Sequence, residues 1–167
     1  MTEKKSKICS KCKQEKSLCD FYKSATKKFG VQSQCKKCRN ELDAKYRREN
    51  PEKIRAYFRK RYKNDENFRV VQLLRNRFWK SLKSQSAKKS KRTLELAGCR
   101  IDELWKHLEK QFKDGMTRQN QGEWHIDHIK PCSLFDLTDP EQQKECFNYK
   151  NLQPLWAEEN LRKGAKW

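Results

Sequence analysis

Apolar residues are scarce in this 167-residue chain, and long apolar runs are absent. Hydrophobic residues make up 34% of the sequence, below the roughly 45–50% that is usual for globular proteins. A single large core is therefore not expected, and so polar a chain needs a metal, long helices or a partner to order it. No apolar run reaches the about 18 residues that a membrane span requires, and no secretory signal is recognisable. We expect an intracellular protein, cytoplasmic or nucleoid-associated, with no membrane partner.

Acidic residues are too few to balance the basic ones. The chain has 41 Lys and Arg against 22 Asp and Glu, a formal net charge of +19. Residues 36–92 hold 21 basic against 6 acidic residues, whereas residues 99–167 hold 11 against 12. A segment with so large an excess of positive charge predicts contact with a polyanion, here DNA, most simply double-stranded. The basic residues expected to contact phosphate in this block are Arg55, Arg59, Lys60, Arg61, Lys63, Arg75 and Arg77.

Four of the eight cysteines form two Cys-x-x-Cys pairs, Cys9 with Cys12 and Cys35 with Cys38. Thiolates two residues apart lie on a tight turn, and four of them give the tetrahedral site that Zn²⁺ accepts at about 2.3 Å per sulfur. Two disulfides are the alternative, which the lack of an export signal disfavours. We predict a four-cysteine module with structural Zn²⁺, a knuckle or ribbon, over residues 1–39. No familiar zinc spacing fits the other four cysteines, which we expect to be small packed residues: Cys19, Cys99, Cys132 and Cys146.

Helix formers dominate residues 40–92, the basic middle of the chain. Asn50 followed by Pro51 predicts that one helix ends just before this pair and another begins at the proline. Apolar side chains recur at helical spacing in that second helix and in a third that starts near Asp65. We expect both stripes to pack against neighbouring elements, with the basic side chains facing phosphate. Residues 84–92 are expected to form a flexible basic joint.

Periodic patterns continue through the C-terminal part. An i, i+3, i+4, i+7 apolar stripe predicts a helix from about 101 to 113, and Asp139 before Pro140 predicts a short helix to about residue 147. The alternation in "WHIDHI" predicts a strand. A second strand is expected through "NLQPL", followed by a helix that ends near Lys163. The expected order is strand, strand, helix.

Histidine is rare, yet two of the three histidines lie together in "EWHIDHIKP". In a strand His125 and Asp127 point to the same side, and His128 follows directly. A carboxylate for a hard cation beside an imidazole base is the combination that metal-assisted hydrolysis needs. For His125 a role at the metal and a local hydrogen bond are both open.

These residues give the C-terminal part a resemblance to the HNH endonucleases. That family has Asp-His or His-His at the end of one strand, an asparagine that opens the next, and His or Asn nine residues later on a helix. Asp127, His128, Asn151 and Asn160 match this pattern, within a resemblance that covers roughly residues 122–166. The resemblance implies a ββα-metal fold and an enzyme that hydrolyses phosphodiester bonds in DNA, one strand at each site.

The resemblance also implies a role for each residue. His128 would be the general base that activates water, Asp127 and Asn160 would hold one divalent cation, and Asn151 would pin the loop that orients the base. Carboxylate and amide oxygens favour Mg²⁺ or Mn²⁺ as that cation. Lys163 could contact the scissile phosphate.

Together these patterns predict an α+β, mainly helical protein in three parts. Residues 1–39 form the zinc-binding module, residues 40–92 the basic helical DNA-binding or linker region, and residues 93–167 the HNH nuclease domain. One alternative is a non-catalytic, zinc-containing nucleic-acid-binding protein in which the ββα unit is a scaffold. Another is an HNH nuclease for branched DNA or RNA. Cutting both strands would need two sites, which a homodimer would supply.

Overall fold

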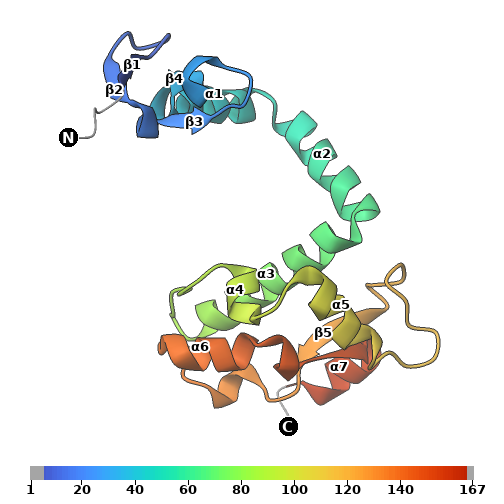
Figure 1. Cartoon of the computed structure of the whole chain (residues 1–167). Helices are drawn as coiled ribbons and strands as arrows, with labels where there is room; N and C mark the ends of the chain where they lie inside the picture. The colour runs from blue at the N-terminus through green and yellow to red at the C-terminus, as the bar shows by residue number, and fades with distance from the viewer. Residues whose placement is uncertain (1–5, 165–167) are drawn as a thin grey trace. The chain divides into compact units, whose positions relative to one another are not determined.

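A computed structural model describes residues 6–164 of the chain (Figure 1). The fold is α+β and mostly helical, as predicted, and its strands form three small two-stranded sheets within the described range. The chain divides into two compact units, residues 1–58 and 59–167. Between residues 6 and 164 no helix is both long enough and apolar enough to cross a membrane.

The first unit consists of two hairpins followed by helix. β1, Ser6–Ile8, pairs antiparallel with β2, Glu15–Ser17. β3, Phe21–Lys23, pairs antiparallel with β4, Val31–Cys35, and α1, Lys36–Glu49, follows at once. Two short 3-10 helices, η1 (Leu18–Asp20) and η2 (Lys28–Gly30), lie beside β3. Helix α2 (Pro51–Asn64) begins in this unit.

Among the described residues of the first unit, three of the five buried side chains are cysteines. They are joined by only two apolar residues in a small cluster: Cys9, Cys35, Cys38, Phe21 and Val31. So small an apolar core cannot offset the chain entropy of about 50 residues without a further contribution. The cysteines are therefore central to the stability of this unit.

The second unit places helices around one hairpin. Its first three helices are α3, Glu66–Ser84, α4, Thr93–Ala97, and α5, Ile101–Glu109. β5, Trp124–His128, pairs antiparallel with β6, Leu152–Trp156, so that Asp127 lies opposite Gln153 and His128 opposite Leu152. Between the strands lie η3 (Cys132–Leu134), α6 (Pro140–Phe147) and η4 (Tyr149–Asn151). The last helix, α7 (Ala157–Lys163), follows β6.

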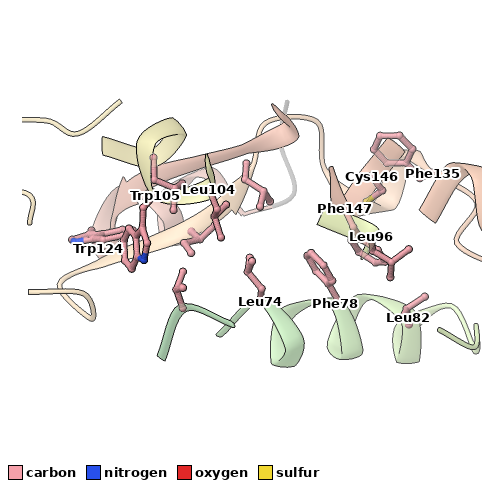
Figure 2. Close-up of a cluster of buried hydrophobic side chains, with 14 of the residues drawn as sticks. Leu74, Phe78, Leu82, Leu96, Leu104, Trp105, Trp124, Phe135, Cys146 and Phe147 are labelled. Atoms are coloured by element: carbon pink, nitrogen blue, oxygen red, sulfur yellow. The ribbon is translucent and has the colours of Figure 1, made fainter. Parts of the chain in front are cut away.

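Helix α3 provides one wall of the core in the second unit. Figure 2 shows Leu74, Phe78 and Leu82 along one side of α3, pointing toward the other elements of the cluster. Phe78 stacks on Phe147 of α6, with their ring centroids 4.1 Å apart. The stripe predicted from the sequence, Val71, Leu74, Phe78 and Leu82, is thus a packed face, although Val71 is only partly buried and its neighbour Val70 is fully buried.

The division into two units differs from the three parts predicted from the sequence. Because α3 packs into the core of the second unit, the basic middle is not a separate part, and residues 59–92 belong with the C-terminal elements. The expected flexible joint is also anchored. The amide of buried Gln143 accepts from Ser90 N at 3.0 Å and donates to the Lys88 carbonyl at 2.8 Å.

Several predicted helix ends are confirmed. α1 ends at Glu49 and α2 begins at Pro51. Asp65 caps α3 by accepting from Phe68 N at 2.8 Å, and Asp139 caps α6 by accepting from Glu141 N at 2.9 Å. α5 ends at Glu109, four residues earlier than the apolar pattern suggested.

Candidate functional site

The predicted strand, strand, helix order is present in the C-terminal part. β5 carries His125, Asp127 and His128, and α7 packs against both β5 and β6. Asn160 and Lys163 are three residues apart on α7, so they lie on the same face of the helix. That face is turned to β5, since both side chains contact residues of the strand. The local fold therefore gathers these predicted site residues.

Asp127 is a buried carboxylate held by two cations. Its side chain is 5% exposed and forms ion pairs with Arg77 of α3 and with Lys163, whose Nζ lies 2.5 Å from Oδ2. A buried carboxylate needs such compensation, because its charge would otherwise be costly away from water. Lys163 also donates to the backbone carbonyl of His128, which ties α7 to the end of β5.

His128 is 2% exposed and lies between aromatic rings of the core. Its ring centroid is 6.2 Å from that of Phe78 and 6.0 Å from that of Phe147. Arg77 Nε donates to His128 Nδ1 at 3.1 Å. Because a guanidinium N–H can only donate, Nδ1 must accept, which places the proton of the neutral ring on Nε2. Nε2 has no hydrogen-bond partner, so Nδ1 is the nitrogen with a lone pair to offer.

Asn151 holds the loop that follows β5. Its Oδ1 accepts from Lys130 N at 2.8 Å, and its Nδ2 donates to the Lys130 carbonyl at 3.1 Å and to the Cys146 carbonyl at 2.9 Å. Its backbone carbonyl accepts from Ile129 N at 2.8 Å. One side chain thus connects the residues directly after His128 to helix α6.

Replacing Asn151 with alanine is expected to loosen this loop. The change leaves the backbone groups of Lys130 without their partner, which costs about 1–3 kcal/mol for a buried group. Urea denaturation should show the loss, and hydrogen exchange of the Lys130 amide should become faster. Asn76→Ala, at an exposed position of α3, is the matched control, and equal effects from the two variants would contradict the anchoring role of Asn151.

Asn160 contacts His125 and not Asp127. The Asn160 Nδ2 and His125 Nδ1 atoms are 3.1 Å apart, and both side chains are half-buried. His125 therefore makes the local hydrogen bond that was one of its two expected roles. His107, the third histidine, is structural: its Nε2 lies 2.9 Å from the Leu152 carbonyl.

Two cysteines lie beside His128. Cys132 Sγ is 3.4 Å from His128 Nδ1, and Cys146 donates its thiol proton to Cys132 Sγ at 3.5 Å. That hydrogen bond is the main reason that the pKa of Cys132 falls to about 4, and the same hydrogen bond, followed by burial, raises the pKa of Cys146. No sequence pattern indicated this group, because the three residues come from β5, η3 and α6 at spacings that match no common motif.

The Cys-x-x-Cys pairs of the first unit meet as predicted. Cys9 and Cys12 lie in the turn between β1 and β2, Cys35 ends β4 and Cys38 is in the first turn of α1. Their four sulfur atoms lie within 4.8 Å of one another. The first turn closes through a hydrogen bond from Lys13 N to the Cys9 carbonyl at 2.9 Å, with Lys13 at a φ of 57°.

Two of these thiols, Cys9 and Cys38, have pKa values shifted in opposite directions. The Cys35 backbone N–H donates to Cys9 Sγ at 3.3 Å and is the main reason that the pKa of Cys9 falls to about 6. Burial, followed by hydrogen bonds from the other cysteines, raises the pKa of Cys38 to about 12. A divalent cation would allow all four to ionise together. The cluster can therefore hold a structural metal such as zinc.

The predicted phosphate contacts are mostly exposed. Arg77 is the exception, since it is turned to Asp127 and His128, and Lys163 is half-buried on Asp127. Beside α3, an open groove is lined by the exposed Trp79, one acidic residue and five basic residues: Arg75, Lys83, Lys89, Lys91 and Arg92. Burial, and then the charge of Arg75, lower the pKa of Lys89.

A second, smaller cleft lies next to the candidate site. It measures about 460 Å³, and residues of α3 and β5 line it, including Arg77, Trp79 and His125. Trp79 borders both this cleft and the basic groove.

The chain is similar to two uncharacterized proteins of Acanthamoeba polyphaga mimivirus. One is 36% identical in an alignment of 192 positions, gaps included, that covers 93% of this chain and 82% of the relative. The other is 40% identical over 122 residues, which cover 72% of this chain and 53% of that relative. The chain belongs to the family of the first of these mimivirus proteins. No family model and no solved structure matches it.

Proposed function

We propose that this protein is a metal-dependent endonuclease of the HNH type that hydrolyses phosphodiester bonds in DNA. The observation that carries the proposal is the arrangement of the ββα segment. Asp127 and His128 end β5, Asn151 holds the loop after them, and Asn160 lies on the helix that packs against β5. A structural scaffold has no need for a carboxylate, a base and an amide in this order, whereas hydrolysis of a phosphodiester needs all three.

His128 would act as the general base through Nδ1. This nitrogen has a lone pair because Arg77 donates to it, and the proton taken from water would be held there. In the free protein Arg77 covers Nδ1 and His128 is buried. The base therefore becomes available only when Arg77 moves.

Asp127 and Asn160 fit the divalent cation implied by the resemblance. The Asp127 carboxylate already pairs with two cationic side chains, Arg77 and Lys163, and Asn160 lies on the same face of α7 as Lys163. The donor atoms are oxygens, which suits Mg²⁺ or Mn²⁺. When bound, this ion would stabilise the charge that develops on the leaving oxygen.

A phosphodiester would compete for the two cationic side chains at the site. Arg77 and Lys163 both pair with Asp127, and phosphate oxygens are good partners for guanidinium and ammonium groups. Transfer of either side chain to the phosphate would free one carboxylate oxygen of Asp127. Transfer of Arg77 would in addition uncover Nδ1 of His128. Substrate binding and assembly of the site would then be the same event.

The basic groove beside α3 supports DNA as the substrate. Five basic side chains face one groove that has a single acidic residue, and Lys83 Nζ lies 4.9 Å from the ring centroid of the exposed Trp79. Such a surface binds phosphates without reading sequence.

A second candidate function is supported by the burial of the site. Asp127 and His128 are 4% and 2% exposed and both are hydrogen-bonded to Arg77. The same contacts would stabilise a non-catalytic nucleic-acid-binding protein, in which the ββα segment is a scaffold. Cleavage is the property that separates the two candidates.

Incubation of supercoiled plasmid with the purified protein tests the proposal. We expect nicked product in Mg²⁺ or Mn²⁺, none in EDTA, and weaker binding at ~200 mM than at ~50 mM salt. His128→Ala should lower the cleavage rate about 10²- to 10⁴-fold while DNA binding persists. Branched DNA and RNA are tested in parallel as substrates.

His128→Asn and His107→Gln complete the experiment. The first keeps much of the buried volume of His128, so that loss of cleavage cannot be attributed to unfolding, and thermal melting checks its fold. The second changes the structural histidine and should cut near the wild-type rate. Cleavage by both His128 variants at the wild-type rate would refute the mechanism, and binding without cleavage in every metal would favour the scaffold.

A further inference from the structure

His128, Cys132 and Cys146 form a compact group that the proposed hydrolysis does not use as a whole. One ligand atom from each lies within 4.8 Å of the other two. The Nδ1 to Sγ distance from His128 to Cys132 is 3.4 Å, and the two sulfur atoms are 3.5 Å apart. His128 and Cys146 are buried, and Cys132 is half-buried, so solvent reaches one side of the group.

These distances resemble the edges of a tetrahedral zinc site. Zn–S bonds of about 2.3 Å and Zn–N bonds of about 2.0–2.1 Å place two sulfurs ~3.8 Å apart, and a sulfur and a nitrogen ~3.6 Å apart. The two measured edges need to open by only a few tenths of an ångström. Two thiolates and an imidazole are soft donors, which select Zn²⁺ over Mg²⁺.

The lone pair on His128 Nδ1 already accepts a hydrogen bond in this structure. Arg77 Nε donates to Nδ1 at 3.1 Å and would have to leave for a metal to bind. Arg77 would lose little, because its second nitrogen keeps the ion pair with Asp127. A water would complete four ligands.

We infer that His128, Cys132 and Cys146 form a second metal site, specific for a soft divalent cation such as Zn²⁺. The site has a consequence that rests on the proposed function. A metal on Nδ1 takes the lone pair with which His128 would accept the proton of water. Zn²⁺ at this site would therefore inhibit the nuclease, while Mg²⁺ at Asp127 and Asn160 would support it.

Counting metal ions tests the site without any assay of activity. The whole chain is kept reduced with a phosphine, loaded with Zn²⁺ and freed of excess, and zinc per chain is measured. We expect two ions in the wild type, one in the four-cysteine cluster and one here, and one ion in Cys132→Ser. Cys146→Ala is the second variant, with the same expectation. Cys99→Ser, a half-buried cysteine outside both groups, should keep two.

Co²⁺ gives an independent reading of the same site. Thiolate-to-cobalt absorption should rise in two steps for the wild type and in one for Cys132→Ser. The same count in the wild type and in Cys132→Ser would overturn the inference. These results do not depend on cleavage. Two ions bound by a protein that never cuts DNA would support the second metal site and refute the proposed function.

Inhibition is measured on plasmid cleavage in Mg²⁺ with increasing Zn²⁺. Each variant is compared with its own rate without Zn²⁺. Loss of one ligand should raise the half-inhibitory Zn²⁺ concentration at least about tenfold in Cys132→Ser, and Cys99→Ser should match the wild type. Equal inhibition of the wild type and Cys132→Ser would show that Zn²⁺ does not inhibit through this group.

Discussion

A strong chelator is expected to unfold the first unit of this protein and to leave the second unit folded. From residue 6 to residue 58 the first unit has only Phe21 and Val31 as buried apolar residues besides its cysteines, whereas the second unit has a core of its own. Zinc binding by comparable cysteine sites contributes an apparent free energy of about 10–16 kcal/mol near neutral pH. Few other interactions in residues 6–49 can replace it.

Hydrogen exchange measured along the chain is the appropriate readout. After metal removal the amides of residues 15–35 should exchange at unprotected rates, and those around Leu74 and Trp105 should stay protected. Cys38→Ser should behave like the chelated protein, and Cys19→Ser, an exposed cysteine outside the cluster, like the wild type. Full protection of residues 15–35 without metal would show that the cluster is not the stabilising element.

Phe78→Ala is expected to have the largest effect on the second unit. Phe78 is fully buried and stacks on Phe147, and removing its ring leaves a cavity between α3 and α6 (Figure 2). Such changes cost about 3–5 kcal/mol. For a unit of this size the melting temperature should fall by roughly 10–20 °C. Thermal melting and urea denaturation followed by circular dichroism measure the loss.

Trp79→Ala is the matched control for this prediction. Trp79 is the next residue on α3, is larger than Phe78 and is 57% exposed. Its removal should change the free energy of unfolding by less than about 0.5 kcal/mol. A loss as large as that of Phe78→Ala would mean that the buried face of α3 has been assigned to the wrong side.

Local signals in the sequence predicted much of the fold. Asn50 with Pro51, Asp65 and Asp139 identify helix boundaries because capping and proline effects depend on residues within one turn. The alternation in "WHIDHI" was enough to identify β5. These signals involve neighbours along the chain, so they can be interpreted without knowledge of the tertiary structure.

Periodicity alone did not distinguish a packed face from an exposed one. α2 and α3 both have apolar stripes, yet α2 has no buried residue while α3 buries Val70, Leu74, Phe78 and Leu82. A stripe shows that a helix can bury one side. Whether a partner covers it depends on elements distant in sequence, and for α3 those elements come later in the chain.

At the candidate site, too, sequence patterns predicted the residues that are close along the chain and missed those that are distant. The predicted grouping of Asp127, His128 and Asn151 follows from a strand, its loop and the next strand, which are close in sequence. Arg77 lies 50 residues before Asp127 and Cys146 lies 18 residues after His128. No spacing links them, and only the packing of α3 and α6 against β5 brings them together.

Under the proposed function, the position of Arg77 would make the binding of DNA and the binding of the divalent cation reciprocal. Its guanidinium contacts both Asp127 and His128 from α3, the helix that also lines the basic groove. Any anion that draws Arg77 away removes a positive charge from Asp127 and so strengthens the binding of a divalent cation there. By thermodynamic linkage the cation must strengthen the binding of the anion by the same factor. Affinity for DNA should therefore rise with the concentration of Mg²⁺, against the general weakening that added salt causes.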